Sequence, residues 1–61
     1  MNSRYRIVIE WDEEDRIFVA SAPQLKRCMA HGSTYEAAAK EIQISIKNWL
    51  ETAKEMGIPI P

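Results

Sequence analysis

Apolar residues recur at helical spacing through one long segment of the chain, from Ser33 to Met56. At the ~100° that each helical residue advances, they fall within ~120° of arc, and the charged residues lie on the opposite side. The apolar stripe consists of Tyr35, Ala38, Ala39, Ile42, Ile46, Trp49, Leu50, Ala53 and Met56. Ser33 or Thr34 is expected to cap the helix, with Ser33 and Glu36 at the spacing of a capping box, and Gly57 is expected to end it. The pattern predicts one amphipathic helix, which needs a second layer to cover its stripe.

The residues before this helix follow the two-residue period of β-strands. From Arg4 to Trp11 alternate positions are apolar, which predicts a half-buried strand. One face of that strand carries Tyr5, Ile7, Ile9 and Trp11. The next four residues are the carboxylates Asp12, Glu13, Glu14 and Asp15. They predict a turn, because they would repel one another inside a packed element, and a second strand from Arg16 to Ser21 would complete a hairpin.

A third strand and an extended tail complete the expected fold. Pro23 ends the second strand, and Leu25 is expected to point inward from the loop that follows. A short third strand is predicted from Cys28 to His31. Residues 57–61 alternate Ile with Pro, so they can form only a sheet edge or an extended arm. The expected class is α+β, a two-layer β-β-β-α domain with a possible fourth edge strand, in which one long helix covers one face of an antiparallel sheet.

The other face of this sheet has no cover from the helix. Val8 and Phe18 are expected there, with Ala20 and Met29 as further members. Ile44 lies ~160° from the centre of the helical stripe and is a second exposed apolar position. A second copy of the chain would bury such surfaces and would offset the small core of a chain of 61 residues. We therefore expect a homodimer or homotetramer. The candidate contact residues are Val8, Phe18, Ile44, Ile58 and Ile60.

Composition narrows the class of protein further. The length fits one domain, residues 1–61, and the formal net charge of −1 lacks the positive excess typical of nucleic-acid-binding proteins. Lys40, Lys47 and Lys54 form a row on the outer face of the helix, but Glu36 and Glu51 lie within one turn of them. We therefore do not expect direct nucleic-acid binding. The single cysteine excludes an internal disulfide and offers no zinc-binding spacing. No apolar run is long enough for a membrane span or a signal peptide, which predicts a cytoplasmic protein.

No catalytic set can be assembled from the titratable residues. His31 is the single histidine, and no nucleophile or orienting carboxylate can be assigned to it. The carboxylates of residues 12–15 are consecutive, whereas a ribonuclease H metal site takes carboxylates from separate strands and a helix. We therefore expect no enzyme activity, no cofactor and no metal. The acidic run is either a solvated hairpin tip or a docking surface for a basic partner, and Trp11 is either the edge of the core or a partner hot spot.

Six short motifs follow one another along nearly the whole chain. They are Tyr5-x-Ile7, Trp11-Asp12-Glu13-Glu14-Asp15, Phe18-x-Ala20-x-x-Pro23, Cys28-x-Ala30-His31-Gly32-x-Thr34-x-Glu36-x-Ala38, Trp49-Leu50-Glu51 and Gly57-x-Pro59-x-Pro61. In this order they resemble the HicB antitoxin family. The resemblance implies a β-β-β-α-β domain, a partly eroded relative of the ribonuclease H architecture.

The resemblance also implies a function. Members of the HicB family usually bind and neutralise HicA-type toxins, which are small basic proteins that cleave messenger RNA, and many also carry a C-terminal DNA-binding segment. The chain stops at Pro61, where that segment would begin, so we expect either the toxin-binding half alone or a solitary structural or regulatory homo-oligomer. The candidate toxin contacts are Trp11, Asp12, Glu13, Glu14 and Asp15.

Two positions depart from the family's pattern. The family's loop usually reads like Pro-x-Leu-Pro-Gly-Cys, whereas Lys26 and Arg27 stand here in place of Pro-Gly. The conformation of this loop therefore does not follow from the resemblance. The start of the family's helix usually carries two acidic residues after the threonine, and here Glu36 is followed by Ala37.

Overall fold

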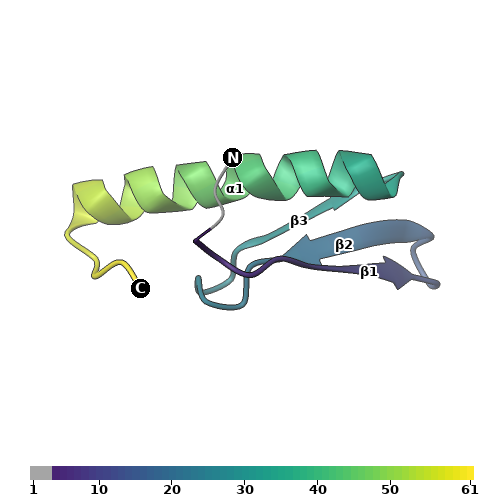
Figure 1. The fold of residues 1–61 in the computed structure, drawn as a ribbon, viewed down its shortest axis with the longest axis horizontal. Coiled ribbons are helices and arrows are strands. Elements are labelled where there is room, and N and C mark those ends of the chain that lie inside the picture. The colour runs from purple at the N-terminus through teal and green to yellow at the C-terminus, as the bar shows by residue number, and fades with distance from the viewer. Residues whose placement is uncertain (1–3) are drawn as a thin grey trace.

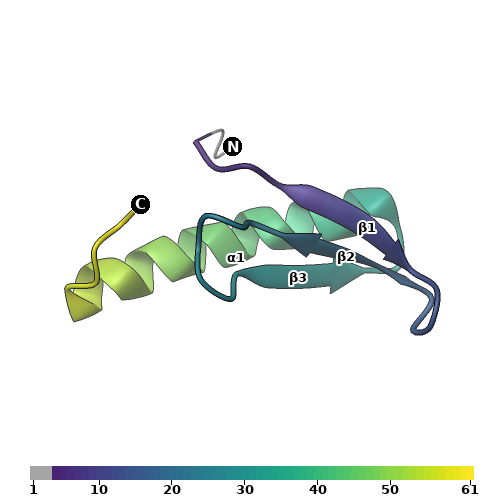
Figure 2. The same ribbon diagram turned by 90° about the horizontal axis from the view of Figure 1, so that it is seen from below.

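A computed structural model describes residues 4–61 and shows three strands followed by one helix (Figure 1). The elements are β1 (Val8–Asp12), β2 (Ile17–Ser21), β3 (Met29–Gly32) and α1 (Tyr35–Met56). The strands pair antiparallel in the order β1-β2-β3, and α1 lies across one face of the sheet (Figure 2). The prediction of an α+β chain with an antiparallel sheet and one covering helix is confirmed.

Strand β1 is shorter than the alternating pattern predicted, because it begins at Val8 rather than Arg4. Val8 pairs with Ser21, which is the last residue of β2, so the residues before Val8 have no opposing strand. The backbone N–H of Arg6 instead donates to Oε1 of Gln24 at 2.7 Å. Tyr5 is nevertheless buried in the core, so it packs as predicted although it lies outside the strand.

The register of the sheet decides which side chains face the helix. Ile9 pairs with Ala20, which pairs in turn with Ala30, and Ala20 is completely buried. Alternate residues of a strand share a face, so Phe18 lies on the same side as Ala20, where it packs against the core and the ring of Tyr35. The prediction that Phe18 and Ala20 lie on the uncovered face is therefore wrong. The apolar residues of the uncovered face are Val8, Ile17, Val19 and Met29.

Both ends of α1 are capped. Thr34 is the N-cap residue, and its Oγ1 accepts a hydrogen bond from the backbone N–H of Ala37 at 3.0 Å. The predicted pairing of Ser33 with Glu36 is wrong, because a cap at Thr34 makes Ala37 the third helical residue. At the other end Gly57 adopts φ 71°, and the N–H of the next residue donates to the carbonyl of Ala53 at 2.8 Å. This is a Schellman motif, so the predicted stop at Gly57 is confirmed.

Gly32 allows the end of β3 to contact the start of α1 directly. A Cβ atom at Gly32 would lie 2.5 Å from the backbone nitrogen of Ala38 and 2.8 Å from the Cβ of Ala37. No side chain fits in that space, because real Cβ atoms do not approach so closely. This contact holds the first turn of the helix against the sheet.

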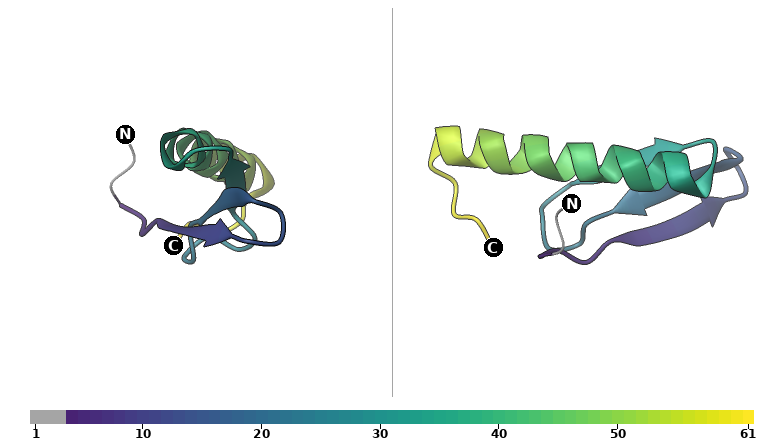
Figure 3. Two further views of the ribbon diagram at one scale, coloured as in Figure 1. Left: turned by 90° about the vertical axis from the view of Figure 1, so that its right-hand side faces the viewer. Right: turned by 45° about the horizontal axis from the view of Figure 1, so that its top comes forward.

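Helix α1 is longer than the sheet that it covers. Its 22 residues span about 33 Å, whereas strands of five residues span about 17 Å. The C-terminal half of α1 therefore extends beyond the sheet (Figure 3), beside the β2–β3 loop and the tail of residues 57–61. Leu25 points inward from that loop and is buried, as predicted. The tail turns back from the end of α1 (Figure 1), and the possible fourth strand is not found within residues 4–61.

Candidate functional site

Asp12 shapes the turn that joins β1 to β2. Its Oδ1 accepts hydrogen bonds from the backbone N–H groups of Glu14 at 3.0 Å and Asp15 at 3.1 Å. Such bonds from a side chain to the backbone two and three residues ahead stabilise turns. Arg16 closes the turn with φ 56°. Asp12 is therefore the last residue of β1, with its carboxylate bound to the turn, rather than one of four equivalent turn carboxylates.

Trp11 lies on the surface beside this turn. Its indole N–H donates to Oε2 of Glu13 at 3.1 Å, and its ring meets that of Phe18 edge to face at 4.9 Å between centroids. The side chain is 47% exposed. The hydrogen bond to Glu13 and the ring contact with Phe18 thus fix the position of an exposed tryptophan.

The carboxylates of Glu14 and Asp15 are exposed. Neither forms a hydrogen bond or ion pair with another side chain among residues 4–61. Their charges are therefore available to a partner, in contrast to those of Asp12 and Glu13. The sequence pattern could not separate these two pairs, because the difference depends on the shape of the turn.

The aromatic contacts continue from the hairpin to the helix. The ring of Phe18 lies 6.1 Å from that of Tyr35, the first residue of α1, and Tyr35 is 55% exposed. The hairpin turn and the start of α1 lie at the same end of the molecule (Figure 1). We call this surface the acidic-aromatic end. It consists of Trp11, Glu13, Glu14, Asp15 and Tyr35.

Sequence reasoning placed Tyr35 in the buried stripe of the helix, and that assignment is wrong. The ring of Phe18, which lies in one cross-strand row with Trp11 and Gly32, contacts one side of the Tyr35 ring, and more than half of the Tyr35 side chain is exposed. Tyr35 is the first residue of the helix, so no preceding helical turn packs beside its side chain. That terminal position was the signal in the sequence that Tyr35 could be exposed.

The predicted oligomer contacts do not form one surface. Val8 lies on the uncovered sheet face, Phe18 on the covered face, and Ile44 is exposed on the outer side of α1. Ile58 and Ile60 lie in the tail and are both partly exposed. Any one interface can therefore use only a subset of these residues.

The remaining candidate residues do not join the acidic-aromatic end. His31 is exposed in β3, and Cys28, which the sequence predicted as the first residue of that strand, is buried just before it. Burial raises the pKa of the Cys28 thiol, so the thiol stays protonated at neutral pH. In the part of the chain that the structure describes, no three His, Cys, Asp or Glu side chains are grouped closely enough to hold a metal ion.

The fold and this surface define a small α+β domain with exposed rings and carboxylates at one end. Comparison of the chain with protein-family models, with curated proteins and with solved structures found no match in any of the three. Within residues 4–61, α1 is too polar to cross a membrane.

Proposed function

We propose that the chain is a HicB-like antitoxin domain of ribonuclease H-related architecture, which binds a small basic HicA-type ribonuclease in the cytoplasm and covers its active site. The observation that carries this proposal is the acidic-aromatic end, where Trp11 and Tyr35 are exposed at the same end of the molecule as the exposed carboxylates of Glu14 and Asp15. The ordered HicB-like motifs along the sequence support the same family.

The composition of this surface suits a cationic protein partner. Tryptophan and tyrosine are enriched among the residues that dominate binding energy at interfaces. Exposed carboxylates beside them raise the rate of association with a basic partner and repel acidic proteins. Trp11 is also held by Glu13 and Phe18, so less side-chain entropy is lost when a partner covers it.

The test is co-expression with the protein encoded beside this chain, purification through a tag on this chain and mass determination of the eluted species. We expect a small basic partner in a defined ratio. Glu14→Lys combined with Asp15→Lys should weaken that complex by about tenfold or more at 0.15 M salt, since like charges would then face each other. The matched control is Glu51→Lys with Glu55→Lys, which makes the same change of charge in the last turns of α1.

The control variant should bind the partner as the unmodified chain does. Recovery of no basic partner would contradict the proposal, and so would equal weakening by both double variants. Trp11→Ala provides an independent check on the apolar part of the surface, because a hot-spot tryptophan costs about 2 kcal/mol or more when truncated, which is roughly 30-fold in affinity.

The uncovered sheet face favours a second candidate, a solitary homo-oligomer of the same fold. It carries the apolar side chains of Val8, Ile17, Val19 and Met29. Paired copies would bury them. Elution of this chain alone, at a multiple of its 7.0 kDa mass, would favour this candidate over the antitoxin.

A further inference from the structure

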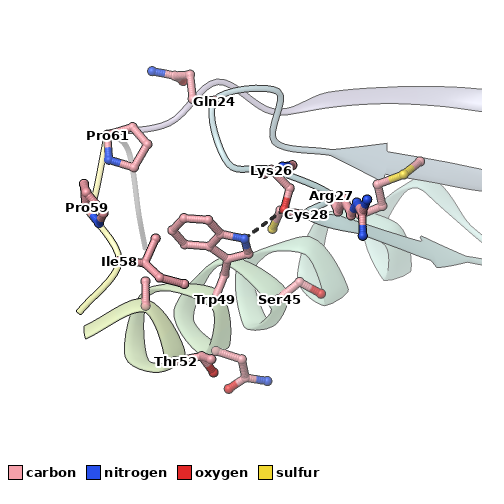
Figure 4. A pocket seen from close by; sticks show the side chains of 13 residues that line it. Gln24, Lys26, Arg27, Cys28, Ser45, Trp49, Thr52, Ile58, Pro59 and Pro61 are labelled. Carbon is pink, nitrogen blue, oxygen red and sulfur yellow. Dashed lines mark hydrogen bonds between the residues drawn. The ribbon is translucent and has the colours of Figure 1, made fainter. Parts of the chain in front are cut away.

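A groove of about 780 Å³ lies between the C-terminal half of α1, the β2–β3 loop and the tail (Figure 4). Trp49 stands at its centre, and the indole N–H donates to the carbonyl of Lys26 at 2.9 Å. This bond connects the overhanging part of the helix to the loop. The apolar lining includes Met29, Trp49, Ile58, Pro59 and Pro61.

Two residues with cationic side chains line the groove. They are Lys26 and Arg27, and no side chain that lines the groove is acidic, although the chain has nine acidic residues and eight basic ones. Arg27 adopts φ 60°, in the left-handed region that favours glycine. A cationic side chain therefore stands at the groove in spite of its backbone cost. An occupant that matches this surface carries carboxylates and an apolar or aromatic group.

The acidic turn of the same protein has this chemistry. Glu14 and Asp15 supply unpaired carboxylates, and Trp11 supplies an exposed ring next to them. The turn and the groove lie at opposite ends of a molecule 37 Å long, so one chain cannot fill its own groove (Figure 1). We propose that the groove receives the acidic turn of a second copy of this chain, in a head-to-tail arrangement.

This arrangement has consequences for assembly and for binding. A head-to-tail contact pairs two different surfaces, so each copy offers one free turn and one free groove, and assembly continues until a ring closes. Because the acidic-aromatic end is used in this contact and in the proposed toxin complex, the two associations compete. The self-association itself does not depend on what the partner is.

The first measurement is the mass of the purified chain by sedimentation across a range of concentrations. We expect the mass to rise above 7.0 kDa with concentration and to return to 7.0 kDa in 1 M salt, where the screening length falls to about 3 Å. A chain that stays at 7.0 kDa at every concentration overturns the proposal.

Two charge-reversed variants test the surfaces. The turn variant carries Glu14→Lys and Asp15→Lys, and the groove variant carries Lys26→Glu and Arg27→Glu. Each variant alone presents two surfaces of the same sign, so each should remain at 7.0 kDa where the unmodified chain associates. In an equal mixture, the acidic turn of the groove variant can bind the basic groove of the turn variant. The basic turn of the turn variant can bind the acidic groove of the groove variant, so association should return.

Association that persists in both single variants, or fails to return in the mixture, overturns the proposal and points to the uncovered sheet face instead. Circular dichroism shows whether each variant is folded. Lys26→Glu alone is the second groove variant, because it leaves Arg27 and its left-handed backbone conformation unchanged. The groove variant keeps its acidic turn and should still capture a toxin, so failure of this proposal and failure of the antitoxin proposal give different results.

Discussion

At the residue scale, two arginines occupy backbone conformations that favour glycine. Arg16 has φ 56° and Arg27 has φ 60°. Arg27 lies in the β2–β3 loop, and a left-handed conformation there costs a residue with a side chain more than it costs glycine. Two backbone bonds close the loop around it, from Ala22 N–H to the Cys28 carbonyl at 3.0 Å and from Cys28 N–H to the Leu25 carbonyl at 3.1 Å. These contacts settle the loop conformation that the sequence could not predict.

Arg27→Gly should raise the free energy of unfolding by about 0.5–1 kcal/mol. Relief of the left-handed conformation is worth roughly 1–2 kcal/mol, and glycine's extra entropy in the unfolded chain removes part of that gain. Urea denaturation measures the difference. Arg16→Gly, at the other left-handed arginine, should give a similar gain, and a loss of stability in both variants would contradict the prediction.

At the element scale, the start of α1 shows how a tertiary contact selects between two adjacent caps. Ser33 and Thr34 both have side chains that suit the N-cap position. Gly32 lies directly against Ala37 and Ala38, so the chain has only two residues in which to turn from β3 into the helix. Thr34 has the extended backbone, φ −128° and ψ 164°, that an N-cap requires, and the helix begins at the next residue.

Thr34→Ala should lower the free energy of unfolding by about 1 kcal/mol, because the N–H of Ala37 loses its side-chain acceptor. Ser33→Ala is the matched control and should change stability by less than about 0.5 kcal/mol. Thermal or urea unfolding followed by circular dichroism measures both. A larger loss in Ser33→Ala would restore the capping box that the sequence predicted.

At the scale of the whole molecule, the overhanging half of α1 depends on segments distant in the sequence. Trp49 binds the carbonyl of Lys26, 23 residues earlier. The hydroxyl of Tyr5 donates to the carbonyl of Pro61 at 3.0 Å, which joins the two ends of the described chain. Beyond the end of the sheet, these two hydrogen bonds connect α1 and the tail to the rest of the chain. Lys26, Trp49 and Pro61 line the groove.

Trp49→Phe should lower the free energy of unfolding by about 1–2 kcal/mol, because it leaves the Lys26 carbonyl without its donor. Amide exchange should accelerate most in residues 49–56, the part of α1 beyond the sheet. Trp11→Phe is the matched control, since it removes an indole bond at an exposed site and should cost less than about 0.5 kcal/mol. An equal or larger loss of stability in Trp11→Phe would contradict the proposed role of the Trp49 hydrogen bond in stabilising the part of α1 beyond the sheet.

Local chemistry was enough to determine several features of this protein. The 3.6-residue period from residue 35 onward predicted the helix, and Gly57 predicted its end, because both depend on neighbours in the chain. The acidic run predicted the hairpin turn for the same reason, and Leu25 was correctly expected to be buried.

Only the tertiary structure decided which residues meet across the molecule. Ile17, Phe18 and Val19 are all apolar, so the sequence did not show which of them faces the helix, and the pairing of Ala20 with Ile9 settled it. The groove around Trp49 followed from the difference in length between helix and sheet, and the exposure of Tyr35 from its position at the start of α1 beside Phe18. A one-residue shift in register exchanges the two faces of a strand, and contacts between distant segments depend on that register, so neither could be derived from the order of residues alone.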